Sequence, residues 1–187
     1  LRAVTGFLVA KLEEVDAEWA PGKDNYCSEF LELPSRDAVE KIMTGMSMLS
    51  GFEMAAERLN VAYDTKAQED EHSCFSDTTH NDMIYDLTGI ANVWSGSYGD
   101  LSGPGLEALA GQIAPDLSTS LGAKIKASVE AARAIPVPFD QAILGEDDAP
   151  GRRAILATIE SLEDQSELLV ALGGEMGFGV PISEGED

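Results

Sequence analysis

Apolar residues recur every three or four positions along most of this chain, which is the spacing of one face of an α-helix. The first such segment covers residues 1–19, and its stripe consists of Val4, Leu8, Leu12 and Val15. Pro21 and Gly22 then end it, because proline cannot continue a helix and glycine frees the backbone. The stripe starts without a capping residue, so we expect this apolar flank to pack against material that precedes Leu1.

A longer segment, residues 37–64, predicts a second helix of about seven turns. Ser35 is a suitable N-cap, because its hydroxyl can accept a hydrogen bond from a free N–H of the first turn. The stripe expected to face the core consists of Ile42, Met46, Leu49, Phe52, Ala56, Leu59 and Tyr63.

Four more helices are indicated: one from Thr79, a short one over 104–113, one capped by Asp116 and one opened by Pro150. No segment shows the sustained alternation that is typical of a strand. We therefore predict an all-α fold, an antiparallel helical bundle, because the connections are mostly short. Residues 1–187 are expected to form a single region in which residues 1–20 face a missing partner and residues 174–187 form an irregular tail.

The composition is acidic, with 34 Asp and Glu residues against 12 Lys and Arg and a net charge of −22. Such a field repels nucleic acid and anionic membrane surfaces, since phosphate binding requires clustered Lys and Arg. It suits cations or basic partners, although acidic residues that serve solubility alone give the same composition. No stretch approaches the roughly 18 apolar residues that span a bilayer.

Reactive side chains concentrate in one run, residues 68–82, which contains both histidines, His72 and His80. Functional groups are often carried by loops that a rigid scaffold positions. A turn between the histidines would let both imidazoles and Glu71 (or Glu69) meet at a metal ion, a common ligand set for divalent metals.

A simpler interpretation of the same run is a helix start. Thr79 and Asp82 have the spacing of a capping box, in which the hydroxyl caps the helix and the acidic side chain reaches back. His80 would then be an exposed residue of the first turn. A cap and a functional role can coexist.

The two cysteines, Cys27 and Cys74, allow one disulfide, although their spacing does not establish it. Cys74 lies two residues from His72, and a thiolate nucleophile needs such a base close by. A buried structural cysteine or the disulfide is the simpler explanation. The EF-hand, His-Glu-x-x-His, Gly-x-Ser-x-Gly and glycine-rich phosphate-loop patterns are all absent from the sequence.

Charges also interrupt the long predicted helix. Glu53 and Glu57 stand four residues apart and repel each other on one face unless Arg58 or a cation neutralises them. The alternative is an ordinary solvated helix flank.

The stretch from Gly51 to Tyr98 resembles the C-terminal half of imelysin-like proteins, the family of the insulin-cleaving membrane protease and the iron-regulated protein A. The string EDEHSCFSDTTH, Glu69 to His80, carries most of this resemblance, and NYCSEF and the helices after Pro104 agree more loosely. The resemblance implies the C-terminal lobe of a two-lobed, all-α fold, in a bacterial protein of the periplasm or outer membrane. Any membrane attachment would use an anchor outside this chain.

The family's proposed metal signature, Gly-x-His-x-x-Glu, is absent, because neither His72 nor His80 is followed by Glu three residues later. The resemblance therefore implies an N-terminal half, separate or missing, as the partner that completes the site. The positions that match the family's recurrent residues, and that we expect to face that half, are Glu57, Arg58, Glu71, His72, Asp77 and His80. Glu71, His72 and His80 are the candidate metal ligands.

Three functions are compatible with this resemblance. The first is the binding or uptake of iron or another divalent cation in the periplasm. The second is a metallopeptidase of the insulin-cleaving type, which would need a bound metal with an open position and a carboxylate base. The third is a non-catalytic lobe that completes the fold of its partner half.

Overall fold

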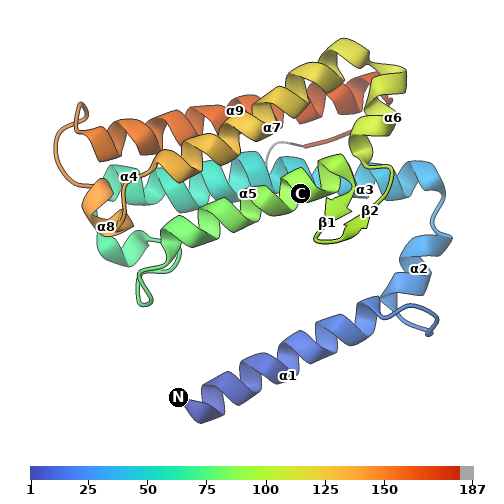
Figure 1. Cartoon of the computed structure of the whole chain (residues 1–187), viewed down its shortest axis with the longest axis horizontal. Helices are drawn as coiled ribbons and strands as arrows, with labels where there is room; N and C mark the ends of the chain where they lie inside the picture. Colours follow the sequence, from blue (N-terminus) through green and yellow to red (C-terminus); the bar gives the residue numbers. More distant parts are fainter. Residues whose placement is uncertain (182–187) are drawn as a thin grey trace. The chain divides into compact units, whose positions relative to one another are not determined.

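The computed structural model describes residues 1–181 and consists almost entirely of helices (Figure 1), so the prediction of an all-α fold is confirmed. The chain divides into two compact units, residues 1–42 and 43–187. Of the predicted tail, residues 174 and 175 still belong to the last helix, and residues 182–187 lie outside the described part.

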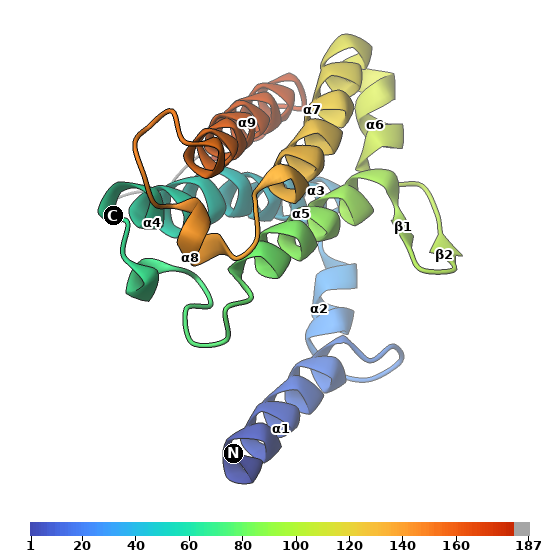
Figure 2. The ribbon, with the colours of Figure 1, turned by 60° about the vertical axis from the view of Figure 1, so that its left-hand side comes forward.

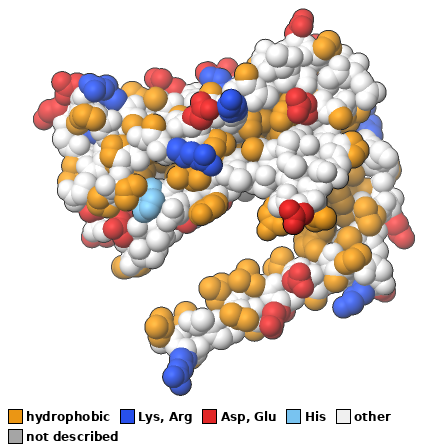
Figure 3. All heavy atoms as spheres, viewed as in Figure 1, with side chains coloured by type: hydrophobic (Ala, Val, Ile, Leu, Met, Phe, Trp, Pro, Cys, Tyr) orange, Lys and Arg blue, Asp and Glu red, His pale blue; other side chains and the backbone are white. Residues whose placement is uncertain are grey.

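The first unit contains α1 (Arg2–Trp19), α2 (Tyr26–Glu32) and the start of α3 (Ser35–Met48). A capping box starts α2, because Asn25 Oδ1 accepts from the Ser28 N–H at 3.3 Å and Ser28 Oγ accepts from the Asn25 N–H at 3.2 Å. Trp19 packs edge-on against the ring of Tyr26, with centroids 5.2 Å apart, and so joins α1 to α2. Helix α1 has no buried residue, and its apolar side chains are visible along its length in Figure 3.

The second unit is an antiparallel bundle of four long helical segments, seen from two directions in Figures 1 and 2. The end of α3 continues through the π-helix η1 (Leu49–Asn60) into α4 (Val61–Thr65). Then follow α5 (Thr79–Ser95), α7 (Pro115–Ala134) and α9 (Pro150–Glu175), with η1 and α7 both packed against α9.

Short elements join the long ones: η2 (Gln68–Asp70), the hairpin β1 (Ser97–Tyr98) and β2 (Leu101–Ser102), α6 (Leu106–Ile113) and α8 (Phe139–Ala142). In the hairpin, Ser97 pairs with Ser102 and Tyr98 with Leu101. Sequence periodicity predicted neither this hairpin nor α2 and α8, because elements this short do not complete an apolar repeat.

The bundle core is made of large apolar side chains from every long segment, supplemented by Phe139 and Ile143 at α8. The fully buried ones include Met43, Met54, Leu59, Met83, Leu87, Leu121, Ile155, Leu162, Leu169 and Leu172. Polar pairs also cross the core between helices: Ser47 Oγ lies 3.0 Å from Ser166 Oγ, and Gln165 Nε2 donates to Ser50 Oγ at 2.8 Å. No helix among residues 1–181 is long and apolar enough to cross a membrane.

The long second helix was predicted correctly, but its buried face only in part, with Met46, Leu59 and Tyr63 in the core. In a π-helix each N–H bonds the carbonyl five residues back, which shifts the side chains away from α-helical positions. Within η1, Ala56 is therefore exposed, Leu49 and Phe52 are only half-buried, and Met54 and Ala55 enter the core instead. Ile42, in α3, is also only half-buried.

The predicted helix caps are corrected as well. Ser35 is the first residue within α3, and Asp116 lies inside α7 behind Pro115. Thr78, not Thr79, occupies the N-cap position of α5, and its side chain makes no capping bond.

Candidate functional site

The loop that precedes α5 is fixed by the Thr79 side chain. Its hydroxyl donates to Glu71 Oε2 at 3.0 Å and accepts from the Ser73 N–H at 3.1 Å. Asp77 closes the loop with a left-handed φ of 53°, which Asp tolerates better than most residues. Thr79 is thus buried and connects the loop to the helix. Its hydroxyl is engaged with the loop, which is why it does not form the capping box predicted with Asp82.

Glu71 is a buried carboxylate that is only partly satisfied. Its side chain is 5% exposed, and its Oε1 has no hydrogen-bond partner among the described residues. Burial raises the pKa of Glu71, and the carboxylates of Asp140 and Asp77 add to the rise, while the Thr79 hydrogen bond and His80 oppose it. Two further buried atoms near this group, His80 Nδ1 and Asp140 Oδ1, also have no partner within residues 1–181.

A second polar group lies between η1 and α5, centred on Arg58. Arg58 Nη2 is 2.7 Å from Glu53 Oε2, and Arg58 Nη1 is 3.3 Å from Asp86 Oδ2. Burial raises the pKa of Asp86, as does Asp82, whereas Arg58 and His72 lower it. The Arg58 guanidinium pairs with two carboxylates, and Asp82 adds a third negative charge near Asp86, so acidic side chains outnumber Arg58 in this group.

The π-helix explains which carboxylate Arg58 binds. Residues five apart come close in a π-helix, so Glu53 and Arg58 meet. The sequence predicted instead that Glu53 and Glu57, four apart, would share a face. Glu57 is exposed, and the ion pairs of Arg58 are with Glu53 and Asp86.

The six residues predicted for the site fall into two sets. Glu71 is buried, and Arg58 and His80 are half-buried around the first turns of α5, whereas Glu57, His72 and Asp77 are exposed. The sequence interpretation missed Asp86 and Asp140, and it named Glu53 and Thr79 only as a helix charge and a cap, not as contacts of Arg58 and Glu71. Asp86 stands four residues after Asp82 on one helix face, a signal that was present in the sequence. Asp140 had no such signal, because only the fold brings α8 close.

The predicted metal set, Glu71, His72 and His80, is not gathered into a site. Within residues 1–181, no group of three or more His, Cys, Asp or Glu side chains is placed to hold a metal ion. Glu71 is turned inward to Thr79 while the adjacent His72 faces solvent. The described residues thus do not fit a complete metal centre on their own.

Both cysteines are free thiols, each half-buried. Cys27 belongs to the first unit and Cys74 to the loop before α5 in the second, and the disulfide considered from the sequence is not formed in the structure.

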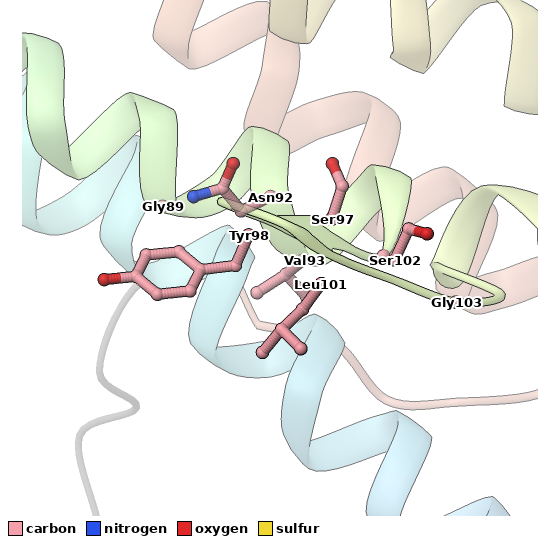
Figure 4. Close-up of a pocket in the computed structure, with 9 residues that line it drawn as sticks. Gly89, Asn92, Val93, Ser97, Tyr98, Leu101, Ser102 and Gly103 are labelled. Carbon is pink, nitrogen blue, oxygen red and sulfur yellow. The ribbon is translucent and has the colours of Figure 1, made fainter.

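A cleft of about 610 Å³ lies between α5 and the hairpin (Figure 4). Gly89, Val93, Tyr98 and Leu101 are among its lining residues, and none of them carries a charge. This cleft contains none of the candidate site residues, and its lining has no Asp, Glu, His, Cys, Lys or Arg.

The sequence model of the Imelysin family matches residues 1–169, which is most of the chain. The chain belongs to the imelysin family. No curated protein matches this imelysin. The family assignment agrees with the helical fold and with the resemblance found around Glu69–His80.

Replacing Glu71 in this imelysin by glutamine is expected to stabilise it at pH 7 by about 1 kcal/mol, because a buried charge with one unsatisfied oxygen is removed. A carboxyl whose pKa is raised by folding contributes stability below its unfolded pKa of 4.5 and loses it as pH rises through the folded pKa. The stability advantage of the Glu71→Gln variant over the parent should therefore shrink as pH falls towards 4.5.

Urea unfolding of both proteins across this pH range measures the difference. Glu69→Gln is the matched control, since Glu69 is exposed two residues earlier and should show no such trend. A Glu71→Gln variant that is less stable than the parent at pH 7 would show that a cationic partner holds the carboxylate in its charged form.

Proposed function

We propose that this imelysin lobe supplies the acidic part of a binding site for iron or another divalent cation. The observation that supports this proposal best is the set of buried, unpartnered carboxylate oxygens around the start of α5, Glu71 Oε1, Asp82 Oδ2 and Asp140 Oδ1. Buried acceptors without donors are costly, and a cation satisfies them. Oxygen and imidazole ligands suit iron and related divalent ions.

The remaining ligands would come from the N-terminal half that the family resemblance implies. We propose that α1 forms part of the contact with that half, in a protein of the periplasm or outer membrane. Apolar side chains of α1 are widely exposed, with Val4 at 72%, Leu8 at 56% and Leu12 at 59%. An apolar stripe of this size on a soluble protein is typical of an interaction surface.

The side chains of this chain favour cation binding over peptidase activity. A metallopeptidase needs a metal with an open position and a carboxylate base beside the activated water. Of the carboxylates around α5, Glu53 and Asp86 are held by Arg58, so neither is free to serve as that base.

The test is cation binding by the protein with both halves present, compared with this chain alone. Calorimetric titration with Fe²⁺ under anaerobic conditions and with Mn²⁺, together with elemental analysis of the dialysed protein, gives affinity and stoichiometry. We expect one tightly bound ion in the two-part protein and at least tenfold weaker binding by this chain alone.

The variants Glu71→Gln and Asp86→Asn should each weaken binding by about tenfold, because each removes one negative charge, Glu71 from among the unpartnered carboxylates and Asp86 from beside Asp82. Glu167→Gln is the control, because the substitution removes the same charge at a different place. Glu167 is exposed beside Ser166, near the other end of the bundle. Absence of a stoichiometric ion, or equal affinity in all three variants, would refute the proposal.

A further inference from the structure

A second cleft, of about 380 Å³, lies between α5 and α7, apart from the candidate cation site. Its lining includes Ala91 and Trp94 from α5 and Gly122, Ile125 and Val129 from α7. The volume is at the small end of the range for ligand sites, about 300–1,000 Å³. At the ~30 Å³ that a water-sized unit occupies, it accommodates a molecule of about a dozen non-hydrogen atoms.

An unsatisfied hydrogen-bond donor lies in the wall of this cleft. Trp94 is 4% exposed, and its Nε1–H has no acceptor among the described residues, although buried indole N–H groups usually find one. On the side of α7 the indole nitrogen faces Gly122, where an added Cβ would lie 3.1 Å from Nε1. Gly122 and Trp94 both line the cleft, so the absence of a side chain at position 122 leaves room beside this buried N–H.

The charged residues that line this cleft are two cations, Lys126 and Arg133, and one carboxylate, Glu130, an excess of positive charge in a chain with a net charge of −22. Lys126 and Arg133 line it and are exposed, one and three turns along α7 from Gly122. Lys126 Nζ is 4.0 Å from Glu130, a loose and solvent-exposed contact, so its charge is weakly compensated. An anion is therefore favoured here, while Ile125 and Val129 favour an apolar body.

We propose that this cleft binds a small amphiphilic monocarboxylate. The hydrocarbon part lies against Ile125 and Val129, and the carboxylate lies where Lys126 and Arg133 can reach it. Arg133 is suited to this because a guanidinium pairs with a carboxylate through two parallel hydrogen bonds. Trp94 Nε1–H contributes directly when an acceptor atom of the ligand enters beside Gly122.

Tryptophan fluorescence of the whole chain tests the proposal. The chain has two tryptophans, so a Trp19→Phe background leaves Trp94 as the only reporter. Decanoate, which has twelve non-hydrogen atoms, is the probe, kept below micelle-forming concentrations. Decanol and decyltrimethylammonium are the neutral and cationic controls. We expect saturable binding and a change in Trp94 emission with decanoate, and at least tenfold weaker binding of both controls.

Three variants in that background locate the ligand. Arg133→Gln should weaken decanoate binding by about tenfold or more, and Gly122→Ala should do the same by covering the indole N–H. Lys124→Gln is the matched control on α7, since Lys124 pairs with Asp164 at 2.8 Å and does not line the cleft. Arg133 is exposed, so its replacement tests the proposal even if Gly122→Ala alters the packing.

No saturable change in Trp94 emission with decanoate would overturn the proposal. So would equal binding of decanol, or equal affinity of the Arg133→Gln and Lys124→Gln variants, because the cleft would then select nothing by charge. Binding lost in Arg133→Gln and kept in Lys124→Gln supports it.

Discussion

Replacing Arg152 by alanine is expected to lower the free energy of unfolding by about 3 kcal/mol, because it leaves two buried carbonyl groups without donors. The side chain is 3% exposed, and its Nη1 donates to Tyr63 O at 2.8 Å and to Ile143 O at 3.0 Å. The guanidinium also lies 3.7 Å from the centre of the Tyr63 ring. One residue thus joins α9 to the end of α4 and to α8.

The ion pair of Arg152 with Asp147 contributes little to this loss, since Asp147 is 85% exposed and water replaces it easily. Urea denaturation followed by circular dichroism measures the change. Arg153→Ala is the control, because Arg153 is the next residue on α9 but is exposed and bonds only the Asp148 carbonyl among the contacts found, at 2.6 Å. It should change stability by less than about 0.5 kcal/mol. Equal losses in the two variants would show that charge, not the buried hydrogen bonds, matters.

The second large effect is expected for Gly151→Ala, which should destabilise the protein by about 3 kcal/mol although alanine is the better helix former. A Cβ on Gly151 would overlap the backbone of α8, coming within 2.6 Å of the Ala142 Cα. Backbone cannot move aside as a side chain can, so α8 or the start of α9 must shift.

Gly174→Ala provides the contrast within the same helix. Nothing lies within 4 Å of a Cβ at Gly174, so this substitution should stabilise the protein by up to about 1 kcal/mol through helix propensity alone. Thermal or urea unfolding of the two variants gives opposite signs if the close approach of α8 is real. A stabilised Gly151→Ala variant would disprove that approach.

The substitutions of Arg152 and Gly151 also affect the candidate site. Helix α8 carries Asp140, whose charge contributes to the raised pKa of Glu71. A substitution of Gly151 or Arg152 that displaces α8 should therefore also reduce the proposed cation affinity. Neither residue is one of the polar residues around the start of α5.

The site itself was predictable only in part. The composition of the run from Gln68 to Asp82 marked it as a candidate site. Glu71 and His80 from this run, together with Arg58 from η1, lie around the first turns of α5. Sequence distance gave no sign that Thr79 would bind Glu71, or that Glu53 and not Glu57 would bind Arg58. The first depends on how the loop folds back, and the second on a π-helix, which periodicity arguments do not anticipate.

By itself the sequence determined the helical class, the approximate positions of the long helices and the family, because apolar periodicity and local motifs depend on neighbours along the chain. The tertiary structure alone decided which face of the second helix is buried, which carboxylates surround Arg58, and that Arg152 and Gly151 join α9 to α4 and α8. Those features arise between segments far apart in sequence, where burial and backbone approach are set by the packing of the whole bundle.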